Sequence, residues 1–422
     1  MTAYNEHVAA DEAQLLHPAP PGVSVPRRRP MAGRNIHEGH RVSTPLELLF
    51  DLTFVVAIAV AGAQLHHAVV EHHLAQGLLG YVTTFAAIWW AWMSFTWFAS
   101  AYDTDDMHYR LCTMVQMVGV LILAAGVPQA MQGQAETLTF GYVVMRVGMV
   151  ALWWRVAREH PERRLTAMRY VVAILLVQAL WVARLALPGD WVYPSWFLLI
   201  LAELLVPVWA QRTGHTPWHA HHISERYGLF TIIVLGECVL GATNAVSSVI
   251  GSQGWSWNVL LVGGGSVALI FALWWVYFLV PFGEALHHHR ERAFRWGYGH
   301  FAIFASLAAT GAFLEVVADQ LKQNVADLTL AKTAVQPVLM IGLVAIAVAI
   351  FLISVWILGR YVAGHRQLKI GWAWIAALGI LTTVVLAVSL GMPLPWALPA
   401  LTMAPTMVII VVERALRKSA HR

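Results

Sequence analysis

The stretch PLELLFDLTFVVAIAVAG, residues 45–62, decides the fold. It opens an apolar run long enough to cross a bilayer, yet Glu47 and Asp51 stand at its beginning. Their four-residue spacing puts both carboxylates on one face of a helix, about 6 Å apart along its axis. Hydrocarbon penalises charged side chains, and two carboxylates repel each other. The pair therefore needs a partner or a special environment.

Composition points to a membrane protein. The 422 residues are 59% hydrophobic and 12% charged, with a mean hydropathy of +0.62, whereas a soluble protein carries roughly 25% charged residues. A lipid bilayer is the environment that accommodates such an excess of apolar side chains. The net charge of +4 is spread over short loops, which argues against a nucleic-acid partner. The two cysteines lie in apolar runs, which argues against a disulfide framework.

Windows of about 20 apolar residues predict twelve membrane spans. The predicted fold is all-α and polytopic. The spans run approximately over residues 45–66, 78–99, 109–128, 137–157, 167–187, 192–211, 224–248, 257–281, 297–318, 336–358, 371–391 and 395–413.

The basic residues predict the orientation. If the N-terminus is cytoplasmic, nearly all Lys and Arg fall in cytoplasmic segments, and an odd number of spans would scramble this asymmetry. We therefore expect both termini in the cytoplasm. Residues 1–44, with the Pro- and Arg-rich run PAPPGVSVPRRRP, are predicted to form a disordered tail. Residues 414–422 are predicted to form a basic cytoplasmic tail.

A faint internal repeat relates the first and seventh spans. Aligning Glu225 with Glu47 also aligns AIWWAW (87–92) with ALWWVY (272–277) one span later. This favours a parallel duplication of six helices, residues 45–211 and 212–413. Chance similarity between apolar segments is the alternative, and the sequence leaves both open.

Three charged residues, Arg146, Glu203 and Glu237, lie ten or more residues inside their spans and so near mid-bilayer. An unpaired charge there costs on the order of 3 kcal/mol. Glu203 or Glu237 is the expected counter-ion of Arg146, and the remaining acid is a candidate for ion binding or proton coupling. The alternative is a buried pair with a structural role only.

The opening carboxylates lie nearer the cytoplasmic end. We expect Glu47 or Asp51 to pair with Arg226, which with Glu225 occupies the corresponding turn of the seventh span, and the other carboxylate to face a cavity. Helix capping combined with a lock between helices is an equally weighted alternative.

The sequence lacks the metal-binding, nucleophile and phosphate-binding motifs that are typical of enzymes. HAHH (219–222) lacks accompanying cysteines and an HExxH spacing, so neither a metal site nor a cofactor is predicted. No GxSxG or phosphate-binding glycine loop occurs. The only candidates for an intramembrane reaction are Glu237, Cys238 and the cytoplasmic histidines. We therefore expect a protein that is not an enzyme.

Two motifs resemble those of the bacterial low temperature requirement A family. They are TPLELLFDLTFVVAIAVAGAQLHH (44–67) and HISERYGLFTIIVLGECVLG (222–241). The resemblance covers about residues 40–415 and implies a multi-pass protein of the bacterial inner membrane. The residues it identifies as motif positions are Glu47, Phe50, Asp51, His222, Glu225, Arg226, Gly228, Gly236 and Glu237.

These observations favour a transporter or channel for a small ion or polar solute that uses intramembrane carboxylates. One alternative is a sensor or scaffold linked to growth in the cold, as the family name implies. The other is an intramembrane lipid-modifying enzyme. The sequence predicts no particular solute and no oligomeric state.

Overall fold

The computed structural model describes residues 28–36, 38, 41–326, 335–363 and 371–420. These residues form helices and loops without a strand, and twelve of the helices are long and apolar enough to cross a membrane. The predicted all-α fold and its twelve spans are confirmed. The long helices and the short α10 are α2 (Pro45–Val70), α3 (Leu74–Tyr102), α4 (Met107–Met131), α5 (Glu136–Glu159), α6 (Arg164–Arg184), α7 (Val192–Ala210), α8 (Ala220–Gln253), α9 (Trp257–Phe278), α10 (Phe282–His288), α11 (Ala293–Ala326), α12 (Pro337–Ala363), α13 (Gly371–Ser389) and α14 (Leu394–Ala420).

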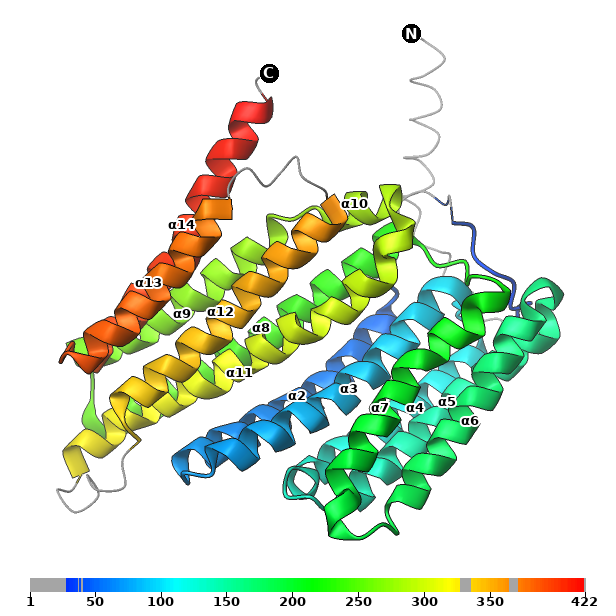
Figure 1. Cartoon of the computed structure of the whole chain (residues 1–422), viewed down its shortest axis with the longest axis horizontal. Coiled ribbons are helices and arrows are strands. Elements are labelled where there is room, and N and C mark those ends of the chain that lie inside the picture. Colours follow the sequence, from blue (N-terminus) through cyan, green and yellow to red (C-terminus); the bar gives the residue numbers. More distant parts are fainter. Residues whose placement is uncertain (1–27, 37, 39–40, 327–334, 364–370, 421–422) are drawn as a thin grey trace, which may run out of the picture.

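The helices run back and forth between two sides of a bundle (Figure 1). We call the side that carries residues 103–106 and 211–219 the near side, and the side that carries residues 71–73, 132–135 and 185–191 the far side. Helix α2 begins and α14 ends on the near side (Figure 1). Which side faces the cytoplasm stays a prediction, as does the duplication.

The two sets of six spans meet along α2 and α3, which pack against α8 and α11. Helices α4 to α7 lie on one flank of this contact and α9, α12, α13 and α14 on the other (Figure 1). Within the first set, α4 and α5 approach most closely, because Gly119 and Gly141 let the two backbones touch. Small residues at such contacts allow packing that larger side chains would prevent.

Local signals explain where the helices begin. Thr44 caps α2 by accepting the backbone N–H of Glu47, and the Glu47 carboxylate in turn accepts the backbone N–H of Thr44 at 2.8 Å. This capping box satisfies two backbone donors that a helix end leaves free. Asp106 caps α4 in the same way by accepting the N–H of Tyr109 at 2.9 Å.

The segment before α2 differs from the expected tail. The side chain of Met31 is fully buried, and the backbone N–H of Met31 donates to the Glu159 carboxylate at 2.7 Å. The N–H of Arg29 donates to Asp106 at 2.8 Å. The described part of residues 1–44 is thus packed on the near side because carboxylates of the bundle bind its backbone, and residues 1–27 lie outside the described residues.

The C-terminal prediction changes in a similar way. Residues 414–420 continue α14 as helix, so the predicted basic tail is not separate from the last span. Residues 421–422 lie outside the described residues.

Candidate functional site

Arg226 of α8 binds both carboxylates of the opening stretch. Its Nε and Nη2 donate to the two oxygens of Asp51 at 3.0 and 2.5 Å. Its Nη1 lies 3.1 Å from Glu47 Oε1, an ion pair without hydrogen-bond geometry. All three side chains have an exposed fraction of 0%. A guanidinium has five N–H donors in a fork and can bind two carboxylates at once, which explains why Glu47 and Asp51 occur on the same face of α2.

Two further side chains complete this cluster. Trp92 of α3 donates its indole N–H to Asp51 at 2.7 Å, and His222 Nε2 lies 3.2 Å from Glu47 Oε2. The predicted pairing with Arg226 is confirmed. The expectation that one carboxylate faces a cavity is wrong, because Arg226 reaches both. We call Glu47, Asp51, His222 and Arg226 the near-side lock, since they join α2 to α8.

The other motif positions surround this lock or lie apart from it. Phe50 is buried, with its ring 4.0 Å from that of Phe95. Glu225 accepts the N–H of Ser43 at 3.3 Å and so holds the residue before the α2 cap. Gly228 faces the ring of Phe278, whereas Gly236 has open space around it.

Arg146 and Glu203 form the mid-membrane pair. Arg146 Nη2 donates to Glu203 Oε2 at 3.1 Å and to the Tyr142 hydroxyl at 2.7 Å. Trp90 donates its indole N–H to the same Glu203 oxygen at 2.8 Å. Arg146 is 5% and Glu203 3% exposed, so a charge pair is retained inside the apolar layer. Of the two predicted counter-ions, Glu203 is the one that binds.

A cavity lies on each side of this pair, between α3, α5, α6 and α7. The far-side cavity has a volume of about 60 Å³ and the near-side cavity about 50 Å³, and Glu203 lines both. The far-side cavity is lined by residues 83–87, 138–142, 178–184 and 192–203 of these helices, and the near-side cavity by residues 90–98, 146–153, 170–174 and 203–211.

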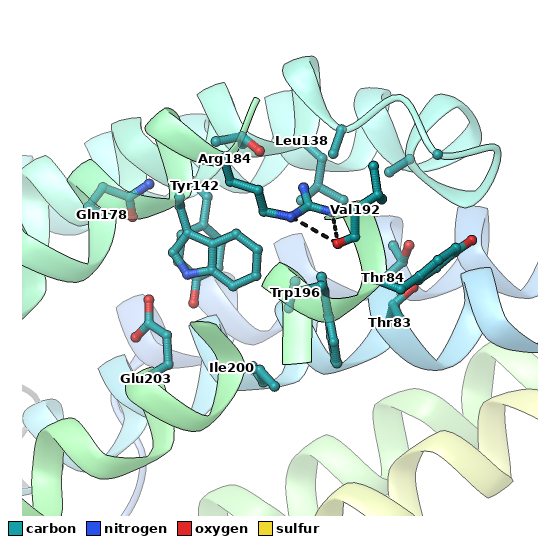
Figure 2. Close-up of a pocket in the computed structure, with 17 residues that line it drawn as sticks. Thr83, Thr84, Leu138, Tyr142, Gln178, Arg184, Val192, Trp196, Ile200 and Glu203 are labelled. Atoms are coloured by element: carbon teal, nitrogen blue, oxygen red, sulfur yellow. Dashed lines mark hydrogen bonds between the residues drawn. The ribbon is translucent and has the colours of Figure 1, made fainter. Parts of the chain in front are cut away.

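In each of α3, α5, α6 and α7, the far-side cavity is lined by residues from one half of the helix and the near-side cavity by residues from the other half. Figure 2 shows the far-side cavity, with Gln178, Tyr142 and Glu203 toward one end and Thr83, Thr84 and Val192 toward the other. Arg184 borders it and is held by the carbonyl of Val192 at 2.8 Å (Figure 2). The Arg146–Glu203 pair therefore lies between two hollows that approach it from opposite sides.

Glu237 lies elsewhere, in a third cavity of about 90 Å³ between α2, α8 and α11. Glu315 of α11 lines the same cavity, with its carboxylate against Gly241. Glu315 is not among the predicted site residues, because its position near a helix end would let it reach the membrane interface. The proton-coupling role of Glu237 stays a prediction.

Sequence reasoning also missed neutral polar residues. Gln178 and Trp181 line the far-side cavity, and a lone Gln inside the run VVAILLVQAL was the signal that could have identified it. Within the described part of the chain, no group of three or more His, Cys, Asp or Glu side chains could hold a metal ion.

The near-side loop between α3 and α4 carries two carboxylates with opposite behaviour. Burial raises the pKa of Asp103 to about 6, with a smaller contribution from the charge of Glu47, although Arg41 lies 3.7 Å away. Burial also opposes ionisation of Asp106, but hydrogen bonds from Arg155 and from the Arg29 backbone outweigh it and hold that pKa below its usual range. Asp106 thus remains an anion that anchors the segment before α2.

Comparison with known proteins agrees with the two sequence motifs. The family model described as Bacterial low temperature requirement A protein (LtrA) matches residues 42–411. An uncharacterized protein of Rhizobium meliloti (strain 1021) is 26% identical over 243 residues, which cover 55% of this chain and 57% of that relative. No solved structure matches the chain. The family match spans most of the sequence, so this multi-pass membrane protein belongs to the bacterial low temperature requirement A family.

Proposed function

We propose that this protein transports a small ion or polar solute across the bacterial inner membrane, through the space between α3, α5, α6 and α7. We assign it no chemical reaction. The observation that carries the proposal is that two cavities reach the Arg146–Glu203 pair from opposite sides and share Glu203. A solute that passes from one cavity to the other has to pass this pair.

The energetics of the pair support this role. A buried ion pair is often no more stable than well-packed apolar side chains of similar volume, because both charges lose their hydration. A pair retained in mid-membrane is therefore weak evidence for stability and better evidence for handling a polar solute. With Trp90 and Tyr142 bound to it, the pair closes the path between the cavities.

Helix α7 is the element best suited to move. Only 17% of the most apolar stretch of this span is buried inside the protein, the lowest share among the twelve described spans. Its main packing partner is α6, and Pro207 interrupts its hydrogen bonding. Because α7 carries Glu203 and lines both cavities, a small tilt of this helix would separate Glu203 from Arg146 and join the two hollows.

The test is flux through purified protein in liposomes. Potassium and proton gradients are followed with indicator dyes, and uncharged polar solutes by the re-swelling of shrunken vesicles. The variant Ser94→Cys, on the wall of the near-side cavity, is assayed before and after reaction with a bulky water-soluble thiol reagent. We expect flux that falls after modification.

Two controls accompany this variant. Ser389→Cys, an exposed serine at the end of α13, should react without loss of flux. The wild type should be unaffected by the reagent because Cys112 and Cys238 are buried. Flux that survives modification at Ser94→Cys would refute the path. Reconstituted protein that accelerates none of the tested ions or solutes would refute transport and favour the sensor, scaffold or lipid-modifying alternatives.

A further inference from the structure

We propose that the far-side cavity binds a small uncharged solute that presents a hydrogen-bond donor and an acceptor side by side, as a primary amide or urea does. The inference rests on the proposed function, because it names the class of solute for the same path. The residues that would recognise the solute are Gln178 and Trp181, next to Glu203.

Unused polar atoms around the cavity carry the proposal. Gln178 is 8% exposed, and within the described structure neither its Nε2 nor its Oε1 has a hydrogen-bond partner. The indole N–H of Trp181 also lacks a partner there. Buried polar groups in native proteins are nearly always paired, so three unpaired atoms on one cavity wall indicate a missing partner inside it.

Charge decides against an ionic solute. Glu203 is already neutralised by Arg146, and the remaining full charge at the cavity is Arg184 at the far-side mouth. An ammonium group would be repelled by Arg184 and would find Glu203 already bound to Arg146. A carboxylate would meet Glu203 and the Gln178 carbonyl. Arg184 already donates to the Val192 carbonyl and to Ser195 Oγ, and a carboxylate paired with it would still leave the Gln178 amide oxygen without a donor. A neutral group with one donor and one acceptor can pair with both ends of the Gln178 amide.

Size and shape agree with this chemistry. The volume of about 60 Å³ is enough for a few water molecules, and so for a solute of a few heavy atoms. Tyr142, Trp181 and Trp196 line the cavity with flat rings. Both bonds to Glu203 end on Oε2, which leaves Oε1 available to accept from the solute N–H.

The experiment measures protection of a thiol inside the cavity. Ile200→Cys lies on the wall beside Glu203 (Figure 2) and is labelled with a small water-soluble maleimide in purified full-length protein. Acetamide is the probe, and acetate and methylammonium are charged probes of similar size. We expect acetamide to slow labelling in a saturable way, and the two ions to have no such effect.

Gln178→Leu in the same background should raise the acetamide concentration needed for protection by roughly tenfold, the factor that corresponds to about 1.4 kcal/mol. The variant should fold at least as well as its parent, because it removes an unpaired buried amide. A structural Gln would instead destabilise the protein when replaced. Trp181→Phe should weaken protection, whereas Trp154→Phe, on an indole that lines neither cavity, should not.

Three results would overturn the assignment: no protection by acetamide, which would mean that water alone fills the cavity; equal protection by the charged probes; or unchanged protection in Gln178→Leu. The outcome separates this inference from the proposed function. Protection without flux would reject transport and keep the binding site. Flux without protection would reject this solute class and keep transport.

Discussion

Replacing Arg226 by Met should destabilise the protein strongly, because the two carboxylates of the opening stretch share this one cation. Arg226 makes two hydrogen bonds to Asp51 and an ion pair with Glu47, and all three side chains are fully buried. Removing one partner of a buried ion pair costs about 3–5 kcal/mol, since the other charge stays in a medium of low polarity.

The cost should lie within that range rather than double it. Once Arg226 is gone, uptake of one proton can neutralise one acid of the pair. Trp92 and His222 still contact the two carboxylates. We therefore expect a loss of about 4 kcal/mol in the free energy of unfolding for Arg226→Met.

The compensating variant makes the reasoning testable. The triple change Glu47→Gln, Asp51→Asn and Arg226→Met removes both carboxylates and the guanidinium of this network together. Because neutral replacements of a buried ion network are often close to neutral in stability, the triple variant should recover most of the loss. Arg212→Met serves as the control for removing one positive charge, because Arg212 is an exposed arginine in the connection between α7 and α8.

Stability is measured by titrating purified protein in detergent micelles with a denaturing detergent and following its tryptophan fluorescence. A loss below about 1 kcal/mol for Arg226→Met would refute the lock, because such a loss is typical of an exposed ion pair. A triple variant as unstable as the single one would refute the explanation by uncompensated charge and point to packing instead.

Three further predictions concern other parts of the molecule. The pKa of Asp103 is raised to about 6, so between about pH 4 and 6 the folded protein holds a proton that the unfolded chain releases. Thermal stability should therefore fall as the pH rises from about 4 to 6, and Asp103→Asn should flatten that slope. Gly141→Ala should cost about 1–3 kcal/mol because the new Cβ overlaps the Leu123 backbone, whereas Gly236→Ala, in open space, should not destabilise; denaturing-detergent titration compares them. Met31→Ala should loosen the buried segment before α2 by roughly 2 kcal/mol or more and speed trypsin cleavage after Arg34 in a time course; unchanged cleavage would contradict this docking.

The fold was predictable because the bilayer imposes a simple rule of length and polarity. Each apolar run of about 20 residues became a helix, and the twelve predicted spans correspond to the twelve in the structure. The exceptions lie where tertiary contacts decide. The segment around Met31 reads as polar and Pro-rich, yet it is ordered because Glu159 and Asp106 accept its backbone N–H groups.

The sequence identified the charged residues of the candidate site but did not predict which residues contact them. Depth in the membrane identified Arg146, Glu203 and Glu237, but the choice of Glu203 as counter-ion depends on α5 facing α7, and no local pattern encodes that contact. Windows of hydropathy also hide single neutral residues. Gln178 barely lowers the mean hydropathy of its apolar run, although its two unpaired amide atoms are the basis of the proposed solute site.

The two buried charge clusters differ in their surroundings. In the near-side lock, the two ion-paired atoms without hydrogen bonds, Arg226 Nη1 and Glu47 Oε1, face each other at 3.1 Å. The pair of Arg146 and Glu203 instead borders two cavities, and Arg146 Nε has no partner among the described residues. Leaving a buried donor unpaired costs about 1–3 kcal/mol. The near-side lock also contains a buried atom without a partner among the described residues, His222 Nδ1, so unpaired atoms alone do not distinguish the two clusters. The distinguishing feature is the pair of cavities that share Glu203, which a purely structural ion pair does not need, and this difference supports the proposed path.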